Sequence, residues 1–291
     1  MSDSFHAGEH AVRERAGKHF GGTIRDTIPD IAAAFLLERP TIVVAGRDDE
    51  ERMWATMLAG SPGFMHAADP RTMSVRARPL PSDPLSPLIE HGGEVGTIVM
   101  DHRRRMRVNG ILTPEAGGFS VATDQVYSNC ARYISERQLV DTERHGEPAV
   151  RKGSRLTADQ AEAIRAADTF FIGTSHPDGP ADASHRGGNP GFVQVDSPAT
   201  CRWPDYDGNS MFMTLGNLAL NPRVGLLFPD WATGGLLQLS GRARIVWDES
   251  AARSLPGAER VVEFTIDAVQ QTEHALGQRW STPRLSKFNP S

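Results

Sequence analysis

The sequence repeats itself at a nearly constant offset of about 130 residues, and this feature constrains the fold more than any other. The segment Ser61–Phe64 (SPGF) recurs as Asn189–Phe192 (NPGF), 128 positions later. Gly96–Asp101 recurs as Gly225–Asp230 at an offset of 129. Because each repeat is long enough to bury a core of its own, the chain is predicted to contain two copies of one small fold.

Apolar runs separated by turn residues predict a similar order of elements in both halves. In the first half we expect a helix over 29–38, a short helix over 125–137, and strands over 41–45, 53–59, 72–77, 95–100, 104–112 and 119–123. The second half should begin with a helix at the capping box of Thr157 and Gln160. It should continue with a helix over 211–220 and strands over 169–174, 181–184, 191–195, 224–228, 236–247 and 261–266.

The many short strands and few long helices indicate the fold class. A doubly wound parallel sheet would need a helix after nearly every strand, so a mainly β (α+β) fold of the barrel type is favoured. The polar segment 140–155, which contains Pro148 and Gly153, is typical of a linker. We therefore expect an N-terminal domain over 1–150 and a C-terminal domain over 151–291.

The composition is that of a globular protein, with 39% hydrophobic and 23% charged residues among 291. A net charge of −5 and a pI near 6.1 argue against a general nucleic-acid binder, which would carry a basic surface. No apolar stretch approaches the roughly 20 residues of a membrane span, and residues 1–10 lack the apolar core of a signal peptide. A cytoplasmic protein without membrane or nucleic-acid partners is expected.

The two cysteines, Cys130 and Cys201, lie in different halves, so the sequence encodes neither a disulfide framework nor a thiolate zinc site. The 10 histidines show no HExxH or similar spacing, and no dedicated metal site is expected. For Cys130 the role of a small buried residue is favoured over that of a reactive thiol.

The segment Ser184–Gly191 (SHRGGNPG) is the first candidate site. Glycine allows a close approach of the backbone to a ligand, while Ser184, Arg186 and Asn189 can donate hydrogen bonds to phosphate or carbonyl oxygens. An ordinary hairpin loop is the alternative. His185 is expected to be an exposed loop histidine rather than a proton donor.

The segment 207–218 (DGNSMFMTLGNL) is the second candidate site. Asn209 or Ser210 can cap the helix that follows, and the free N–H groups at a helix start attract a phosphate. The two segments can therefore grip one anionic ligand between them. An ordinary capped helix is the alternative.

Four arginines stand at positions 103, 104, 105 and 107 of a predicted strand, where alternate side chains face opposite sides. Arg105 and Arg107 are the pair expected to reach an anionic ligand across the two halves, and a solvated strand face is the alternative. Trp231, in a turn, could stack on a planar ring, whereas Trp247 and Tyr127 are expected to pack in the core.

Three motifs in the second half, HRGGNPGFVQV, DGNSMFMTLGNLALNPRVGLLF and LQLSGRARI, resemble the pyridoxamine 5′-phosphate oxidase-like, FMN-binding split-barrel family. Three in the first half, WATMLAGSPGF, GTIVMDHRRRMRVNG and QVYSNCARYI, resemble the N-terminal portion of a long, tandem branch of that family. The resemblance implies two tandem split β-barrels with short peripheral helices. It also implies that the barrels pair within the chain as a pseudo-dimer and hold FMN in the cleft between them.

The resemblance further implies a set of cofactor-binding residues, in which the first segment lines the flavin and the second holds its phosphate. Arg105, Arg107 and Trp231 are added to these two segments. The complete set of expected cofactor-binding residues is Ser184, His185, Arg186, Gly187, Asn209, Ser210, Thr214, Asn217, Arg105, Arg107 and Trp231. The first half has the proline-rich segment 81–88 in place of the second segment. Because proline removes backbone donors, one FMN per chain is expected.

The implied activity is that of an FMN-dependent oxidoreductase, which takes electrons from a reduced nicotinamide or similar donor and acts on a small molecule. Oxidation of a vitamin B6 phosphate is not assigned, because the tandem arrangement departs from that enzyme. The first alternative is a flavin- or haem-binding protein that stores, senses or degrades its ligand. The second is a structural protein whose barrels have lost the cofactor. A homodimer is compatible with the sequence.

Overall fold

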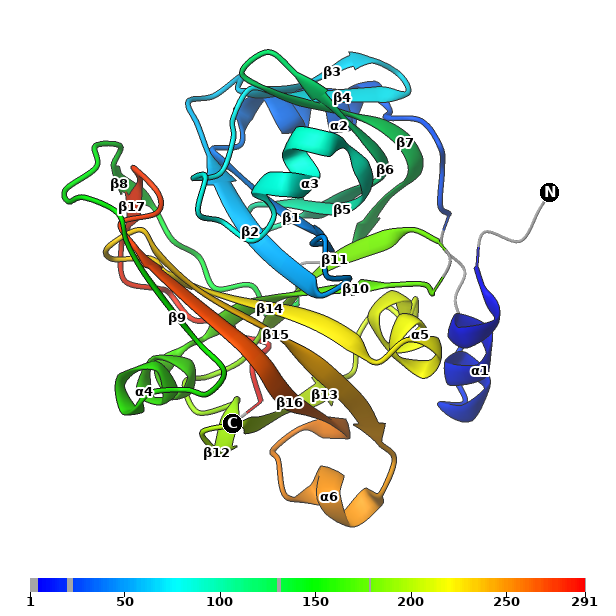
Figure 1. The fold of residues 1–291 in the computed structure, drawn as a ribbon. Coiled ribbons are helices and arrows are strands. Elements are labelled where there is room, and N and C mark those ends of the chain that lie inside the picture. Colours follow the sequence, from blue (N-terminus) through cyan, green and yellow to red (C-terminus); the bar gives the residue numbers. More distant parts are fainter. Residues whose placement is uncertain (1–4, 20–22, 130–131, 178, 291) are drawn as a thin grey trace.

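Two antiparallel sheets, one for each half of the chain, form the body of the protein (Figure 1). The computed structural model describes residues 5–19, 23–129, 132–177 and 179–290. The first sheet contains β1 (Thr41–Arg47), β2 (Met53–Ala59), β3 (Met65–Asp69), β4 (Thr72–Val75), β5 (Gly93–Met100), β6 (Arg105–Glu115) and β7 (Gly118–Asn129). The second contains β9 (Ala149–Gly153), β10 (Thr169–Ser175), β11 (Ala181–Gly187), β12 (Gln194–Ser197), β13 (Thr200–Tyr206), β14 (Arg223–Asp230), β15 (Gly235–Val246) and β16 (Ala258–Glu273).

The order of the strands is the same in both sheets. It runs β2-β1-β5-β6-β7-β4-β3 in the first and β11-β10-β14-β15-β16-β13-β12 in the second, where β9 adds to β16. Each strand of the first sheet therefore has its equivalent at the same place in the second. This correspondence confirms the internal repeat and the mainly β fold of two tandem split barrels.

Short helices lie around the sheets, and a small two-stranded sheet joins β8 (Leu139–Asp141) to β17 (Arg279–Trp280). The helices are α1 (Ala7–Arg15), α2 (Asp30–Glu38), α3 (Ser86–His91), α4 (Ala158–Ala166), α5 (Met213–Leu220) and α6 (Glu249–Arg253). The predicted capping box is present at α4, where Thr157 and Gln160 exchange side-chain-to-backbone hydrogen bonds of 3.0 and 3.3 Å. Within the described ranges no helix is long and apolar enough to cross a bilayer.

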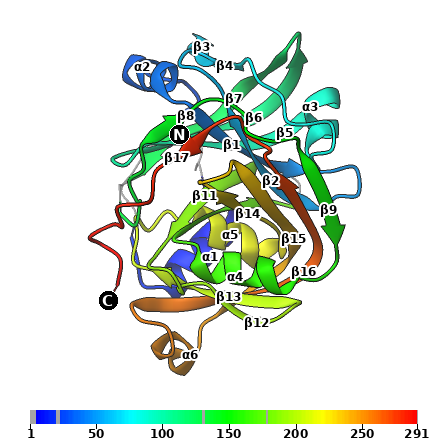
Figure 2. The ribbon, with the colours of Figure 1, turned by 90° about the vertical axis from the view of Figure 1, so that its left-hand side faces the viewer.

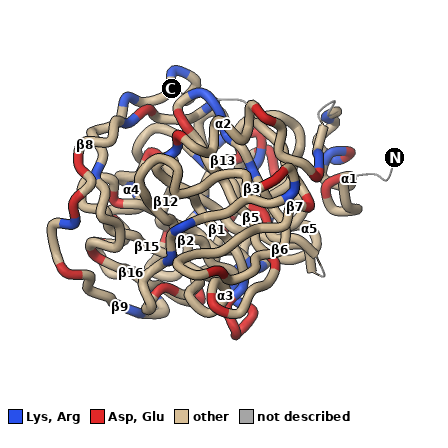
Figure 3. The backbone as a smooth tube through the Cα atoms, turned by 90° about the horizontal axis from the view of Figure 1, so that it is seen from above, with Lys and Arg blue, Asp and Glu red and all other residues tan. Residues whose placement is uncertain are grey.

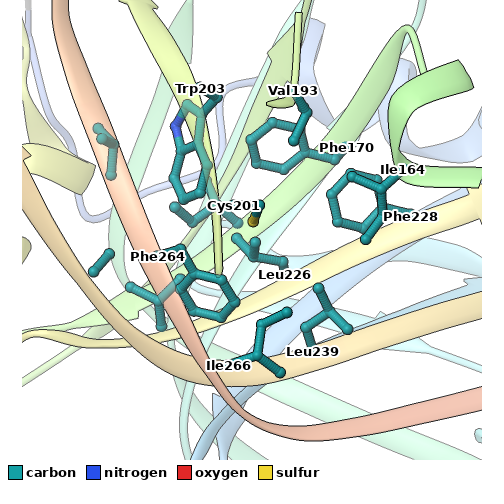
Figure 4. Packing of buried hydrophobic residues seen from close by; sticks show 14 of the residues in the cluster. Ile164, Phe170, Val193, Cys201, Trp203, Leu226, Phe228, Leu239, Phe264 and Ile266 are labelled. Atoms are coloured by element: carbon teal, nitrogen blue, oxygen red, sulfur yellow. The ribbon is translucent and has the colours of Figure 1, made fainter. Parts of the chain in front are cut away.

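Each half has its own apolar core, and a third apolar cluster joins the halves. In the core of the second half, the ring of Phe170 lies 5.2 Å from the rings of both Trp203 and Phe228 (Figure 4). The joining cluster takes buried side chains from both sheets, among them Val43, Ala45, Met57, Ile98, Phe171, Ala183, Leu227 and Leu236. The two barrels therefore pack as an intrachain pseudo-dimer, in which β1 and β2 lie against strands of the second sheet (Figure 2).

Two equivalent glycines allow the sheets to approach at backbone distance. A Cβ on Gly96 would lie 2.5 Å from the Cα of Asp182, and a Cβ on Gly225 would lie 2.5 Å from the Cα of Trp54. Gly96 and Gly225 are repeat equivalents, and so are Trp54 and Asp182. The same close contact thus occurs twice, once on each side of a pseudo-twofold axis, and it fixes the geometry of the cleft described below.

The predicted helix over 125–137 is wrong. Residues 125–129 instead extend β7, in which Gln125 pairs with Asn109 and Asn129 with Arg105. The long neighbouring strand β6 supplies backbone partners that outweigh the local preference of this segment. The strand expected over 191–195 begins only at Gln194, because Gly191 adopts a left-handed φ of 92°.

Several short elements were not predicted, including α1, α3, β3 and β13. Residues 149–153, inside the segment expected to be a linker, form β9 and pair with β16. Basic and acidic residues are interspersed along the backbone when the protein is seen from above (Figure 3).

Candidate functional site

A cleft opens where the second barrel meets the end of the first. The second half contributes β11, the end of β13, the loop 207–212 and the start of α5. The first half contributes β6, the end of β7 and two residues that follow it. The space within and above the cleft totals about 920 Å³, open solvent included. Charged or hydrogen-bonding side chains that line it are Lys18, Arg105, Arg107, Asn129, Arg132, Tyr133, Ser184, His185, Arg186, Asp205, Tyr206, Asp207, Asn209, Ser210, Thr214, Glu259 and Arg260.

Arg107 joins the two halves at the base of the cleft. Its side chain is buried, and from β6 it reaches β11. Nε donates to the carbonyl oxygen of Ala183 and Nη2 to Oγ of Ser184, both at 2.9 Å. Arg107 Nη1 is buried and has no hydrogen-bond partner among the described residues. The solvated strand face considered for Arg105 and Arg107 is therefore wrong, since both side chains are buried.

Asp182 is the counter-charge of Arg107. One carboxylate oxygen lies 3.6 Å from Arg107 Nε and also accepts hydrogen bonds from Tyr127 Oη (2.6 Å) and Asn109 Nδ2 (3.3 Å). Ser184 donates to the other oxygen at 2.9 Å. Burial and the neighbouring Asp182 raise the pKa of Tyr127 well above 10. The phenol therefore stays protonated and donates to the carboxylate.

The lining of the cleft carries more positive than negative charge. Six basic side chains line it, against three acidic ones. The acidic side chains are engaged with some of the basic ones: Lys18 binds Asp207 at 2.9 Å, and Arg260 binds Asp205 at 2.7 Å. Arg186, partly exposed, donates to the carbonyl oxygen of His185 at 3.1 Å. The remaining positive charge suits an anionic ligand.

His185 is buried, so the expected exposed loop histidine is wrong. Only 2% of its surface is accessible, and neither ring nitrogen has a hydrogen-bond partner among the described residues. Burial and then the positive charge of Arg105, Arg186 and Arg107 lower its pKa well below 6.5. The imidazole is therefore neutral at physiological pH. The strand β11 begins at Ala181 and includes His185, which the sequence placed in a loop.

The loop 207–212 forms one wall of the cleft, although not as a helix cap. Asn209 Oδ1 accepts a hydrogen bond from the backbone N–H of Met211 at 3.0 Å. The N-cap of α5 is Phe212, which has a left-handed φ of 57° and makes no side-chain capping bond. The expected cap by Asn209 or Ser210 is therefore wrong. Both residues nevertheless line the cleft, as does Thr214 in the first turn of α5.

Two of the expected site residues lie away from the cleft. Asn217 points to the other side of α5, where Nδ2 donates to Oγ1 of Thr174 at 3.0 Å and Oδ1 lies 2.9 Å from His6 Nε2. The ring of Trp231 packs at 5.2 Å from that of Trp280 in a separate part of the surface. Trp247, expected in the core, packs partly buried against the core of the second half.

Cys130 lies outside the described residues. Cys201 is buried in the core of the second half, and burial raises its pKa to about 12. Within the part of the chain that the structure describes, no three His, Cys, Asp or Glu side chains cluster in a way that could hold a metal ion.

A second cleft occupies the equivalent position in the first half, and its chemistry differs. Residues 56–59, the repeat equivalents of 184–187, line it. Met57 and Leu58 therefore occupy the positions of His185 and Arg186. Gln238, the equivalent of Arg107, donates to the carbonyl oxygen of Ala55 at 3.1 Å. The repeat therefore preserves the contact between the halves, but uncharged side chains stand at the positions of Arg107 and Arg186.

A buried acid occupies this second cleft. Asp83 accepts hydrogen bonds from Oγ1 of Thr56 at 2.6 Å and from Nε2 of Gln238 at 3.2 Å. Burial raises the pKa of the Asp83 carboxyl. The basic residues of this cleft, Arg78 and Arg144, donate to backbone carbonyl oxygens. The second cleft thus offers an anion two basic side chains, against six in the first cleft.

Sequence patterns did not indicate several residues of the first cleft, namely Lys18, Arg132, Tyr133, Asp205, Tyr206 and Arg260. Asp205 and Arg260 are brought together because β13 and β16 pair in register. The rings of Tyr133 and Tyr206 lie 5.1 Å apart, although Tyr133 follows the first barrel and Tyr206 ends β13. No local signal could have shown these contacts, because each joins segments far apart in the sequence.

No curated protein matches this chain. Solved structures that resemble part of it include a conserved hypothetical protein from Mycobacterium tuberculosis (17% identity, 42% of this chain and 88% of that chain, TM-score 0.31). Another is a protein of the pyridoxinephosphate oxidase family from Clostridium acetobutylicum, related to general stress protein 26 of Bacillus subtilis (13%, 43% and 92%, TM-score 0.31). A third is an FAD-binding protein from Mesorhizobium loti (15%, 42% and 97%, TM-score 0.30).

The second half also matches a family model in sequence. The match covers residues 156–279 and therefore includes β11, β13, the loop 207–212 and α5, which together form the second-half wall of the first cleft. The model is that of pyridoxamine 5′-phosphate oxidase. Residues 156–279 of this chain thus match the pyridoxamine 5′-phosphate oxidase family.

Proposed function

We propose that the first cleft binds FMN and that the protein is an FMN-dependent oxidoreductase acting on a small molecule. The observation that carries this proposal is the excess of three basic side chains in the lining of the cleft that the family-matched half forms with the first half of the chain. The whole chain has a net charge of −5, so this local excess opposes the overall balance. A phosphate monoester, with a charge between about −1.5 and −2 near neutral pH, would offset at least half of it.

The donors present in the cleft fit a phosphorylated flavin. Arg186 of β11 offers a guanidinium donor, and Ser210 of the loop 207–212 offers a hydroxyl donor. Charge-assisted hydrogen bonds from arginine to phosphate are among the stronger polar contacts in proteins. Nη1 of Arg107, which is buried next to β11, is a further donor without a partner among the described residues. Apolar groups from Phe192 and Met213 complete the lining and can contact a ring system.

Bound FMN would supply the hydride and electron transfer, so the protein's own residues need only bind and orient it. Arg107 and Asp182 fix β11 against the first barrel and so hold Ser184 in place. The neutral imidazole of His185 adds no charge to this wall. A reduced nicotinamide is the proposed electron donor, because its phosphates also suit a positively charged cleft.

An absorbance spectrum of the purified protein with added FMN, before and after NADH or NADPH, tests the proposal. We expect flavin bands that bleach on addition of the nicotinamide. A Soret band after incubation with haem, without flavin binding, would favour the haem-binding alternative. A protein that binds neither would support the loss of the cofactor.

Two arginine variants make the test specific to the cleft. Arg186→Gln removes one positive charge from the lining and is expected to weaken FMN binding roughly 10- to 100-fold, the range of one charge-assisted hydrogen bond. Arg223→Gln removes the same charge from an exposed position on β14 and should leave the affinity unchanged. Equal losses in the two variants would place the FMN elsewhere.

A further inference from the structure

The N-terminal helix α1 lies on α5 of the second half (Figure 1). The contact is closest at two glycines. A Cβ on Gly8 would lie 2.2 Å from the carbonyl oxygen of Gly216, and a Cβ on Gly216 would lie 2.3 Å from Cγ of Glu9. The two helices thus touch at backbone distance, and a side chain on either glycine would force them apart.

The same N-terminal segment binds the loop 207–212, which forms one wall of the cleft. Arg13 donates from Nε to the carbonyl oxygen of Ser210 at 3.3 Å and from Nη2 to that of Met211 at 3.2 Å. Lys18, which itself lines the cleft, binds the carboxylates of Asp207 at 2.9 Å and Glu259 at 2.8 Å. Both side chains therefore act on the cleft from outside the family-matched half.

The loop is held in a conformation that its sequence disfavours. Ser210 and Phe212 have φ values of 58° and 57°, in the left-handed region that non-glycine residues seldom adopt. Strained residues of this kind persist where surrounding contacts hold them, and they are common at ligand sites. Arg13 binds the carbonyl oxygens of Ser210 and of Met211, the residue between the two strained positions.

We propose that Arg13 is a positioning residue of the FMN site, which acts by holding the loop 207–212 in the conformation that binds the ligand. The loop presents Asn209 and Ser210 to the cleft and leads into Thr214. Without Arg13 the strained residues can relax, and these groups leave the cleft wall. For its ligand this inference rests on the proposed function. The hold on the loop can be measured without any ligand.

The test compares FMN dissociation constants, measured from flavin fluorescence, for the full chain and four variants. Arg13→Ala should weaken binding by about tenfold or more, which corresponds to about 1.4 kcal/mol. Arg13→Lys should recover part of the loss, because an ammonium can reach one of the two carbonyl oxygens. Gly8→Ala should weaken binding in a similar way by displacing α1, although alanine favours a helix. Arg15→Ala is the control, since Arg15 stacks 4.4 Å over the ring of Trp247 and makes no hydrogen bond to the loop among the described residues.

Amide hydrogen exchange over residues 207–212, measured without ligand, separates this inference from the proposed function. Exchange should rise in Arg13→Ala and stay unchanged in Arg15→Ala. Unchanged exchange and unchanged FMN affinity in Arg13→Ala, or equal effects in both variants, would overturn the inference. If the unmodified chain binds no FMN, the proposed function fails, and a rise in exchange confined to Arg13→Ala would show that the hold on the loop remains correct.

Discussion

Replacement of Arg107 by alanine tests whether one ion pair holds the two halves at the cleft. Asp182 is almost inaccessible, with 2% of the residue exposed, and among the described residues Arg107 is the basic residue within 4 Å of its carboxylate. The other groups bound to Asp182 are neutral: Tyr127, Ser184 and Asn109. Arg107→Ala would therefore leave a buried carboxylate without a counter-charge.

The expected cost follows from this geometry. Removal of one partner of a buried ion pair typically costs about 3–5 kcal/mol. The 3.6 Å separation and the three remaining neutral donors place Arg107→Ala at the lower end, about 3 kcal/mol. For a protein of this size each kcal/mol lowers the melting temperature by about 2–4 °C, so a decrease of about 6–12 °C is expected. Urea unfolding should show the same loss as a lower midpoint with an unchanged slope.

Matched variants distinguish this charge effect from a general loss of packing. Arg104→Ala changes an exposed arginine just before β6 and should alter stability by no more than about 0.5 kcal/mol. Arg107→Gln copies Gln238 at the equivalent position, which bonds to the Ala55 carbonyl, and should cost less than the alanine variant. Asp182→Asn in the Arg107→Ala background should restore stability, because it removes the unpaired charge. A loss below about 1 kcal/mol, or no recovery in the double variant, would refute this reasoning.

Three further predictions concern the pH dependence, the interface and the stoichiometry. The pKa of His185 lies well below 6.5 in the folded protein, so the unfolded chain takes up a proton first as the pH falls below 6.5. The free energy of unfolding therefore decreases by up to about 1.4 kcal/mol per pH unit below that pH. His185→Gln should flatten this part of the stability profile in urea unfolding between pH 7.5 and 5.5, and parallel profiles would contradict the burial of a neutral imidazole. Gly96→Ala and Gly225→Ala should both strongly destabilise the pairing of the barrels. Gly153→Ala is the control: a Cβ on Gly153 would lie 3.6 Å from its nearest neighbour, so this variant should melt at an almost unchanged temperature. A spectroscopic titration should saturate near one FMN per chain, because the second cleft has two basic side chains where the first has six. Saturation near two would show that the second cleft also binds FMN.

The sequence predicted most strands of both sheets because apolar runs and turn residues are local signals. It failed at Gln125–Asn129, where pairing with β6 decides the structure, and at the start of α5, where Phe212 rather than Asn209 or Ser210 takes the N-cap position. Both errors have one cause. In both places the chain contacts a segment far away in the sequence, β6 for residues 125–129 and Arg13 of α1 for the loop before α5, and the local pattern could not specify these contacts.

The candidate site was predictable only in part, and for the same reason. The segments containing Ser184–Gly187 and Asn209–Thr214 do meet at one cleft. The side of α5 that faces the cleft could not be predicted, so Asn217 was assigned to the wrong face. Lys18 and Arg260 reach the cleft from parts of the chain with no motif of their own.

The sequence by itself determined that the chain holds two copies of one mainly β fold, because the repeat, the spacing of apolar runs and the turn residues are written in consecutive positions. Only the tertiary structure decided which side chains line the cleft of each copy. Arg107 and Gln238 are equivalent in the repeat, yet one lies in a positively charged cleft and the other beside a buried acid. The charge of a cleft is the sum over side chains from several distant segments, and that sum exists only once the barrels have packed together.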